Sequence, residues 1–354
     1  MKTFENSRVL ITGGTGSLGR TVIRRLLAGD HGLPRRIVVF SRDEAKQYQM
    51  RMAYARRRVA TEDLVYHKAH ERLEFVVGDI RDPQTVAAVL RDIDIVVNAA
   101  ALKQVPTCEY FPFEAVRTNI GGAENIVRAL REHALPVRTV VGVSTDKACK
   151  PVNVMGMTKA IQERLLIQAN LTCPDTRFVC VRYGNVLASR GSVVPLFHSQ
   201  IAAGGPVTVT SSDMTRFLLS LDDAVSLVFD AVERARPGET YVPDVPAARV
   251  TDVAAALIGE RRIKVEITGI RPGEKTHEIM VSEDECHRTV RADGGRFAIL
   301  PVVPELRPDL GGRPTLDREF SSSDRVLDRA AVRELLAQHH LLTPAEHAPD
   351  EEYL

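Results

Sequence analysis

Val9-Leu10-Ile11-Thr12-Gly13-Gly14-Thr15-Gly16-Ser17-Leu18-Gly19 has the pattern of a buried strand, a glycine-rich turn and the start of a helix. Gly13, Gly16 and Gly19 lack a Cβ, so backbone N–H groups and the helix N-terminus can approach a pyrophosphate. A Gly-x-x-Gly-x-x-Gly match is weak by itself, but it is specific when it opens a chain of alternating strands and helices. We therefore predict that this turn, including Thr15, Ser17 and Leu18, binds a dinucleotide cofactor.

The first half of the chain does alternate in this way. Helix-length segments such as Thr21–Ala28 and Ala115–Ala134 carry apolar residues at three- and four-residue spacing. Near-continuous apolar strands between such helices indicate a parallel sheet covered on both faces. We therefore predict an α/β fold with a doubly wound parallel sheet of the Rossmann type. The strands are expected at Arg8–Thr12, Arg36–Ser41, Leu73–Val77, Asp94–Asn98, Val137–Ser144 and Arg177–Arg182.

The pattern loosens after Arg182. We predict a dinucleotide-binding domain over residues 1–182, its sheet completed by segments from about 216–258. A smaller, interleaved substrate-binding lobe is expected over 183–291 and a C-terminal extension over 292–354. The elements expected in this half are strands at Val207–Thr210 and Gly238–Pro243 and helices at Ser220–Arg236 and Ala330–Gln338.

Composition excludes several classes of partner. The 354 residues include 44% hydrophobic and 26% charged side chains, as expected for an ordinary globular protein. Because 47 basic residues balance 46 acidic ones, there is no reason to expect nucleic acid or a membrane surface as the partner. The sequence has no apolar run long enough for a membrane span and no signal peptide at its start. The five cysteines form no Cys-x-x-Cys pair, which favours free thiols in the cytoplasm and no metal site.

The residues after the second and third strands are expected to bind the adenosine half of the cofactor. Ser41 and Arg42 favour the 2′-phosphate of NADP, whereas Asp43 keeps NAD open as the alternative. Asp79, followed by Ile80, is placed to meet the adenine amine. The small side chains of Ala99, Ala100 and Ala101 end the fourth strand and let the cofactor lie close.

Ser144-Thr145-Asp146-Lys147 ends the fifth predicted strand, at the edge of the sheet where ligands of this fold bind. A nucleotide-binding reductase normally carries Tyr-x-x-x-Lys shortly afterwards, with the tyrosine as proton carrier. Here Met155 stands at the tyrosine position, and a thioether cannot exchange a proton. Lys159 shares a helix face with Met155 and is expected to hold the nicotinamide ribose. Either the chain binds a cofactor without catalysis, or Asp146 and Lys147 do the acid–base work.

Together these motifs resemble the UDP-N-acetylglucosamine 4,6-dehydratase family of extended short-chain dehydrogenase/reductases. The resemblance covers roughly Ser7 to Val281, and some members of that family also have methionine in place of the tyrosine. Many relatives carry an N-terminal membrane region that this sequence does not show, so the resemblance implies the stand-alone soluble form. Besides the motifs already quoted, it rests on Gly78-Asp79-Ile80-Arg81-Asp82, Ala99-Ala100-Ala101-Leu102-Lys103, Val181-Arg182-Tyr183-Gly184-Asn185-Val186, Ser189-Arg190-Gly191-Ser192, Met214-Thr215-Arg216-Phe217 and Ile270-Arg271-Pro272-Gly273-Glu274-Lys275.

The resemblance implies a closed redox cycle on a UDP-sugar. C4 is oxidised, water is eliminated across C5 and C6, and the hydride returns to C6, so that the cofactor is recycled. Lys147 would be the base, with Lys159 and the nicotinamide cation lowering its pKa. Asp146 would be the acid, kept protonated by burial, and Thr145 would hydrogen-bond the reacting O4.

The resemblance also assigns the binding residues. Guanidinium groups are suited to a diphosphate, and carboxylates to ribose hydroxyls. Lys103 and Asn119 are expected near the cofactor. The residues expected to bind the sugar nucleotide are Lys103, Asn185, Arg216 and Arg271 (on the diphosphate) and Glu274 (on the uridine ribose).

Two other functions stay open at this point. A UDP-hexose 4-epimerase would also oxidise C4, but it would not eliminate water. A non-catalytic NAD(P)-sensing protein would need neither the Asp-Lys pair nor arginines aimed at a diphosphate. A homo-oligomer is expected from the fold alone.

Overall fold

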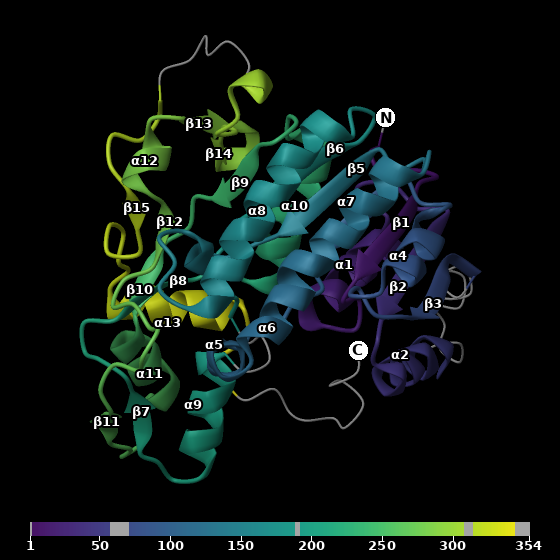
Figure 1. Ribbon diagram of the computed structural model, residues 1–354. Helices are drawn as coiled ribbons and strands as arrows, with labels where there is room; N and C mark the ends of the chain where they lie inside the picture. Colours follow the sequence, from purple (N-terminus) through teal and green to yellow (C-terminus); the bar gives the residue numbers. More distant parts are fainter. Residues whose placement is uncertain (1, 57–70, 188–191, 308–313, 344–354) are drawn as a thin grey trace.

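The computed structural model describes residues 2–56, 71–187, 192–307 and 314–343 (Figure 1). A nine-stranded sheet runs through the molecule in the order β13-β14-β9-β6-β5-β4-β1-β2-β3. The seven strands from β9 to β3 are parallel, whereas β14 and β13 add an antiparallel edge. Their bounds are β1 Arg8–Thr12, β2 Arg36–Ser41, β3 Leu73–Val77, β4 Ile95–Asn98, β5 Thr139–Val143, β6 Arg177–Val181, β9 Thr240–Pro243, β13 Thr289–Ala292 and β14 Arg296–Ile299.

Helices cover both faces of this sheet, which confirms the doubly wound fold (Figure 1). Residues alternate along a strand, so Val9 and Ile11 belong to one core and Leu10 to the other. The first core includes residues of α1 (Ser17–Ala28), α2 (Glu44–Arg56) and α10 (Leu221–Arg234). The second includes residues of α4 (Pro83–Leu90), α7 (Gly122–Glu132) and α8 (Val154–Thr172).

The helix expected over Ala115–Ala134 is interrupted in the structure. The chain passes through α6 (Pro112–Ala115) and a π-helical turn, η2 (Val116–Gly121), before α7 begins. The amide of Asn119, in the π turn, donates hydrogen bonds to the Leu102 carbonyl and the Thr158 hydroxyl. These bonds join the end of β4 to α8, and π turns of this kind are common at functional sites.

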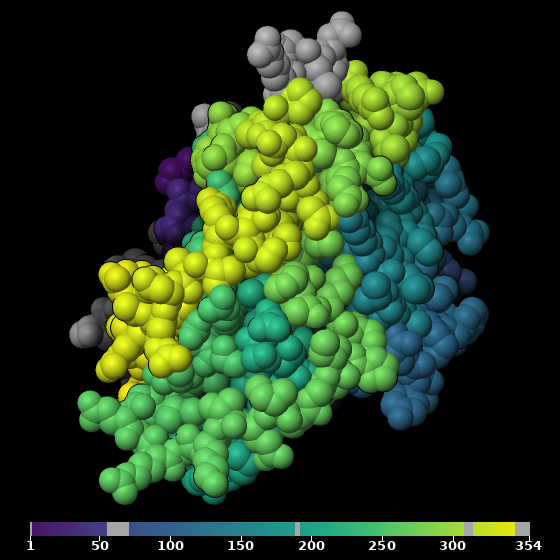
Figure 2. Space-filling view, turned by 90° about the vertical axis from the view of Figure 1, so that its left-hand side faces the viewer, coloured from purple at the N-terminus to yellow at the C-terminus, as the bar shows by residue number. Residues whose placement is uncertain are grey.

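The smaller lobe has one core of its own, and a second core that it shares with β9 and β14 of the large sheet. Its described elements are α9 (Val193–Ala202), β7 (Val207–Val209), β8 (Thr215–Phe217), β10 (Ala247–Arg249), α11 (Val250–Ile258), β11 (Val265–Ile267), β12 (Ile279–Val281), α12 (Glu283–Cys286), β15 (Phe320–Ser321) and α13 (Arg329–Gln338). Figure 2 shows these later parts of the chain, green to yellow, gathered on one face of the molecule.

The edge strand β13 ends at Ala292, where the C-terminal extension was expected to begin, and its partner β14 lies within that extension. Further on, β15 pairs with β12 and α13 packs on α11 in the lobe. The division into three segments stays a prediction. Across the described ranges, no helix has the length and apolarity needed to cross a membrane.

Candidate active site

A cavity of about 770 Å³ lies at the carboxyl ends of the parallel strands, against the lobe. Its walls contain nearly all of the residues singled out in the sequence. These are Gly13, Thr15, Gly16, Ser17, Leu18, Gly19, Ser41, Arg42, Asp43, Asp79, Ile80, Ala99, Ala100, Ala101, Lys103, Thr145, Lys147, Met155, Lys159, Asn185, Arg216, Arg271 and Glu274. Asp146 and Asn119 are the exceptions, because both are buried behind the wall.

The glycine turn forms one end of the cavity and fits a diphosphate. Gly13 has φ +64°, and a Cβ there would lie 2.9 Å from the backbone of Ala100. Gly16 is the N-cap of α1 and supplies no side-chain hydrogen bond to it. The first N–H groups of the helix, from Ser17 onward, therefore face the cavity without a side-chain cap, as a phosphate site requires.

The carboxylates on the adenosine side are already paired with cations. Lys46 donates to Asp43 at 2.5 Å, and this hydrogen bond lowers the pKa of Asp43. Arg81 donates to both carboxylate oxygens of Asp79 and lowers the pKa of that group in the same way. Arg42 is exposed at the cavity, and its guanidinium makes no hydrogen bond or ion pair with any part of the chain that the structure describes.

Thr145, Asp146 and Lys147 form a compact hydrogen-bonded group where β5 ends. The chain enters a 3-10 turn, η3 (Asp146–Ala148), with Thr145 as its N-cap. Asp146 is 0% exposed, and its Oδ1 accepts from Thr145 Oγ1 at 2.9 Å and from Lys147 Nζ at 3.1 Å. Its Oδ2 has no partner within the described residues, and a Cβ on Gly184 would lie only 3.1 Å away. Among the described residues, the hydrogen bonds that link Asp146 to the cavity thus run through Thr145 and Lys147, which both line it.

Glu278, which the sequence motifs did not single out, completes this group. It lies just before β12, is 2% exposed, and places Oε1 3.2 Å from Lys147 Nζ. Burial alone would lower the pKa of Lys147, but the carboxylates of Asp146 and Glu278 outweigh it and raise that pKa. Lys159 is not among the groups that shift this pKa in the protein without cofactor, and the expected effect of a nicotinamide cation stays a prediction.

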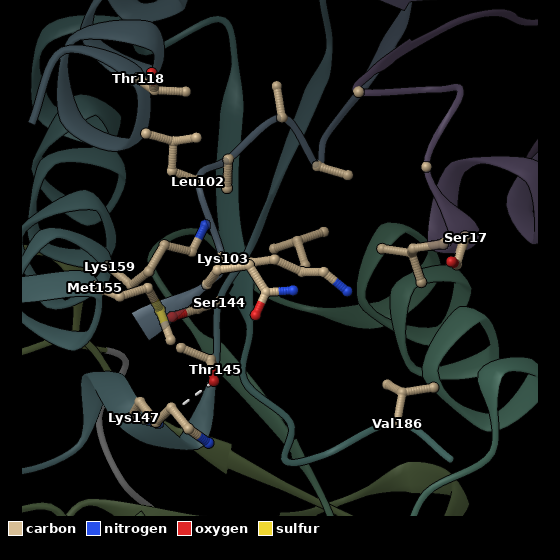
Figure 3. Close-up of a pocket in the computed structure, with 18 of the residues that line it drawn as sticks. Ser17, Leu102, Lys103, Thr118, Ser144, Thr145, Lys147, Met155, Lys159 and Val186 are labelled. Carbon is tan, nitrogen blue, oxygen red and sulfur yellow. Dashed lines mark hydrogen bonds between the residues drawn. The ribbon is translucent and has the colours of Figure 1, made fainter. Parts of the chain in front are cut away.

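Met155 and Lys159 lie on α8 beside this group, as their spacing predicts (Figure 3). Met155 packs in a small apolar cluster with Cys108 and Ala115. Lys159 Nζ donates to Gln162 Oε1 at 2.8 Å, and burial lowers the pKa of this lysine to about 8. In Figure 3, Lys159, Met155, Thr145 and Lys147 line one side of the cavity and Ser17 lies on the other.

We expect Lys159→Met to stabilise the cofactor-free protein at pH 7, because a buried ammonium is removed. A pKa shift from 10.5 to about 8 corresponds to roughly 3 kcal/mol, which sets the upper limit of the gain. The folded chain loses this proton near pH 8 and the unfolded chain only near pH 10.5, so the penalty fades between these values as the pH rises. Denaturant unfolding followed by circular dichroism at pH 7 and pH 10.5 measures the gain. A loss of stability at pH 7 would contradict this account.

The opposite wall of the cavity comes from the lobe and from the loop after β6. Arg216 donates to the carbonyls of Thr215 and Thr276, which fixes its guanidinium at the wall. Asn185 Oδ1 and Ser192 Oγ are buried and have no partner in the described part of the chain. Buried polar atoms are normally satisfied, so these atoms indicate a ligand. Residues 189–191 of the quoted Ser-Arg-Gly-Ser motif lie outside the described residues.

A buried ion-pair network joins the ends of β5 and β6 to α8 and α12. Arg182 is 3% exposed and donates to Glu163 and Glu285, while Ser144 donates to Glu163 at 2.5 Å. Burial raises the pKa of Glu285, but Arg182 outweighs it and lowers that pKa to about 2. Only Arg182 and Ser144 belong to the quoted motifs, because the two glutamates come from other parts of the chain.

The parallel sheet, the glycine turn and a cavity lined by Thr145, Lys147 and Lys159 define an extended short-chain dehydrogenase/reductase. The chain belongs to the polysaccharide biosynthesis protein family, whose model matches residues 9–298.

Similar proteins fall into two groups by name. The chain is 40% identical over 345 residues to a UDP-N-acetylglucosamine 4,6-dehydratase (inverting) of Campylobacter jejuni, covering 94% of this chain and 97% of that one. It is 42% identical over 304 residues to a UDP-glucose 4-epimerase of Rickettsia bellii, covering 84% of each. The solved structure of Pen from Bacillus thuringiensis matches 96% of this chain and 99% of its own, with 33% identity and a TM-score of 0.83. Solved dehydratases and epimerases at 22% identity or less share the fold, and some were determined with NAD bound.

Proposed function

We propose that this protein is a UDP-N-acetylglucosamine 4,6-dehydratase that inverts C5. The observation that carries the proposal is the buried group of Thr145, Asp146 and Lys147 at a nucleotide-sized cavity, with methionine at the usual tyrosine position. The Campylobacter relative has this activity in its name and matches the chain almost end to end.

The bound nicotinamide cofactor supplies oxidation at C4 and reduction at C6. Lys147 takes the 4-hydroxyl proton as C4 is oxidised and, after releasing it to solvent, takes the proton from C5, which the C4 ketone has made acidic. C5 regains a proton from solvent on its opposite face when the hydride returns to C6. Thr145 Oγ1 donates its one proton to Asp146 Oδ1, so it accepts a hydrogen bond from the 4-hydroxyl and can turn to donate to O4 once the ketone has formed. Asp146 supplies the proton that leaves with the 6-hydroxyl as water, and it does so through Thr145 or Lys147, since it does not line the cavity itself.

The sugar nucleotide would lie along the wall formed by the lobe. Arg216 and Arg271 hold the diphosphate as bidentate donors, and Glu274 accepts from the uridine ribose. Asn185 and Lys103 face the sugar at the junction with the cofactor. The unpartnered Oδ1 of Asn185 supports this assignment.

The cofactor is proposed to be NADP, held by the glycine turn, by Asn119 through Leu102, and by Lys159 at its ribose. Lys46 pairs with Asp43 and Arg81 with Asp79, which leaves Arg42 as the cation beside Ser41 that has no ion-pair partner in the described residues. We expect Arg42→Ala to weaken NADP binding about tenfold or more while changing NAD binding little. Calorimetric titration with both cofactors measures this, with Arg128→Ala on α7 as the control. Equal losses for both cofactors would argue against a 2′-phosphate site.

The direct test of the function is incubation with UDP-N-acetylglucosamine followed by mass spectrometry. A dehydratase gives a product lighter by one water. A 4-epimerase is the second candidate, because the Rickettsia relative carries that name at similar identity. An epimerase gives a product of unchanged mass, so one spectrum separates the two functions.

We also propose that the protein is a homo-oligomer and works in the cytoplasm. Large apolar side chains are exposed on neighbouring helices: Tyr110, Phe111 and Phe113 at α5 (Val105–Tyr110) and α6, and Met157 and Ile161 on α8. The five cysteines are free and buried. Light scattering of the purified protein measures the oligomeric state.

A further inference from the structure

Glu278 lies between the proposed base and a proposed diphosphate-binding residue. Its Oε1 is 3.2 Å from Lys147 Nζ and 3.8 Å from Arg216 Nε. Its backbone is fixed on both sides by Ser322, whose hydroxyl accepts from the Glu278 N–H and whose N–H donates to the Glu278 carbonyl. These bonds fix the backbone from which the carboxylate projects, while its Oε2 has no partner within the described residues.

A carboxylate that is 2% exposed is stable only if cations or donors satisfy it. Four charged groups face Lys147: Asp146 from η3, Glu278, Arg216 from β8 and Lys275 from the loop before β12. Lys275 is engaged elsewhere, because its Nζ donates to the Cys149 carbonyl at 2.7 Å. Lys147 thus sits between two carboxylates, and Glu278 is the one that approaches from the lobe.

We propose that Glu278 is a positioning residue that orients Lys147 in the cavity and sets the pH at which this lysine loses its proton. The inference rests on the proposed function, since it concerns the base of that reaction. Asp146 touches Lys147 from the neighbouring residue and Glu278 from the lobe, so the two contacts fix the amine from two directions. Because Arg216 touches the same oxygen, the carboxylate also joins the catalytic group to the nucleotide-binding wall.

The test is Glu278→Gln, which keeps the shape and removes the charge. Without this charge the ammonium is less stable, so the acid limb of kcat/KM against pH should move to lower pH by about one unit. The plateau above this limb should fall about tenfold, because the amine has lost one of two orienting partners. Glu283→Gln, an exposed carboxylate of α12 that pairs with Lys150, is the matched control and should leave the limb in place.

Calorimetric titration with UDP separates positioning from disruption of the site. Glu278→Gln should bind UDP at least as tightly as the unmodified protein, because a negative charge near the diphosphate has been removed. If Glu278→Gln does not fold, Glu278→Asp replaces it in the test. Its shorter side chain places the carboxylate farther from Lys147, so the acid limb should move to lower pH by less than one unit.

If a Glu278 variant folds and binds UDP but its acid limb of kcat/KM stays at the same pH, the proposal for Glu278 is overturned and the proposed function is left intact. Lack of turnover of UDP-N-acetylglucosamine by the unmodified protein would overturn both. A loss of UDP binding with an unshifted limb would show that Glu278 merely supports the wall.

Discussion

Replacing Lys147 by methionine is expected to lower kcat for dehydration by about 10³-fold or more, because the proposed base is removed. Lys147 lines the cavity and contacts both buried carboxylates. Methionine keeps much of the length of the side chain but cannot take up a proton. UDP and cofactor should still bind, since the glycine turn and the arginines are untouched. Steady-state kinetics with UDP-N-acetylglucosamine, together with binding titrations, measure this effect.

Met155→Leu is the control for that variant, because leucine nearly preserves the volume of a side chain that lines the cavity and packs in a small apolar cluster. We expect its kcat to stay within about tenfold of the unmodified protein. The reverse order of effects, with Met155→Leu more damaging than Lys147→Met, would contradict the assignment of the base.

Asp146→Asn is expected to bind substrate and oxidise C4 but to stall before water leaves. The amide keeps the shape of the carboxyl and cannot release a proton to the 6-hydroxyl. Enzyme-bound reduced cofactor should then accumulate and absorb in the near ultraviolet, while product formation falls by about 10²-fold or more. Stopped-flow absorbance at single turnover measures both events. Full turnover by this variant would remove Asp146 from the acid role.

Thr145 provides a second test of how this proton travels. Asp146 Oδ1 contacts the cavity only through Thr145 Oγ1 and Lys147 Nζ. If the hydroxyl carries the proton, Thr145→Val should stall at the same point as Asp146→Asn, and Thr145→Ser should turn over. Stalling by Asp146→Asn together with normal elimination by Thr145→Val would show that the proton does not pass through this hydroxyl.

The sequence predicts the parallel strands well because each buried strand is a short, continuous run of apolar residues. β1, β2 and β3 have the predicted bounds, and the apolar runs behind them need no information from elsewhere in the chain. The antiparallel strands β13 and β14 were not predicted, since each is only four residues long and β13 carries the charged Arg291. The π turn at Val116–Gly121 was also missed, because its apolar spacing is that of an ordinary helix.

For the site, local motifs identified the cavity wall but not its electrostatics. Residues that follow successive parallel strands meet at one edge, so Gly13, Asp79 and Thr145 could be placed together in advance. Glu278 could not, because it meets Lys147 only through the packing of the lobe. The motifs also missed part of what raises the Lys147 pKa, because Glu278 adds to the effect of the neighbouring Asp146.

We propose above all that Lys147 and its carboxyl neighbours move the protons that a tyrosine moves in ordinary reductases of this fold. Turnover of UDP-N-acetylglucosamine in heavy water, followed by proton NMR, tests it most directly. We expect a 4-keto-6-deoxy product that carries deuterium at C5 with inverted configuration. A product that keeps its 6-hydroxyl and differs only at C4 would contradict the account.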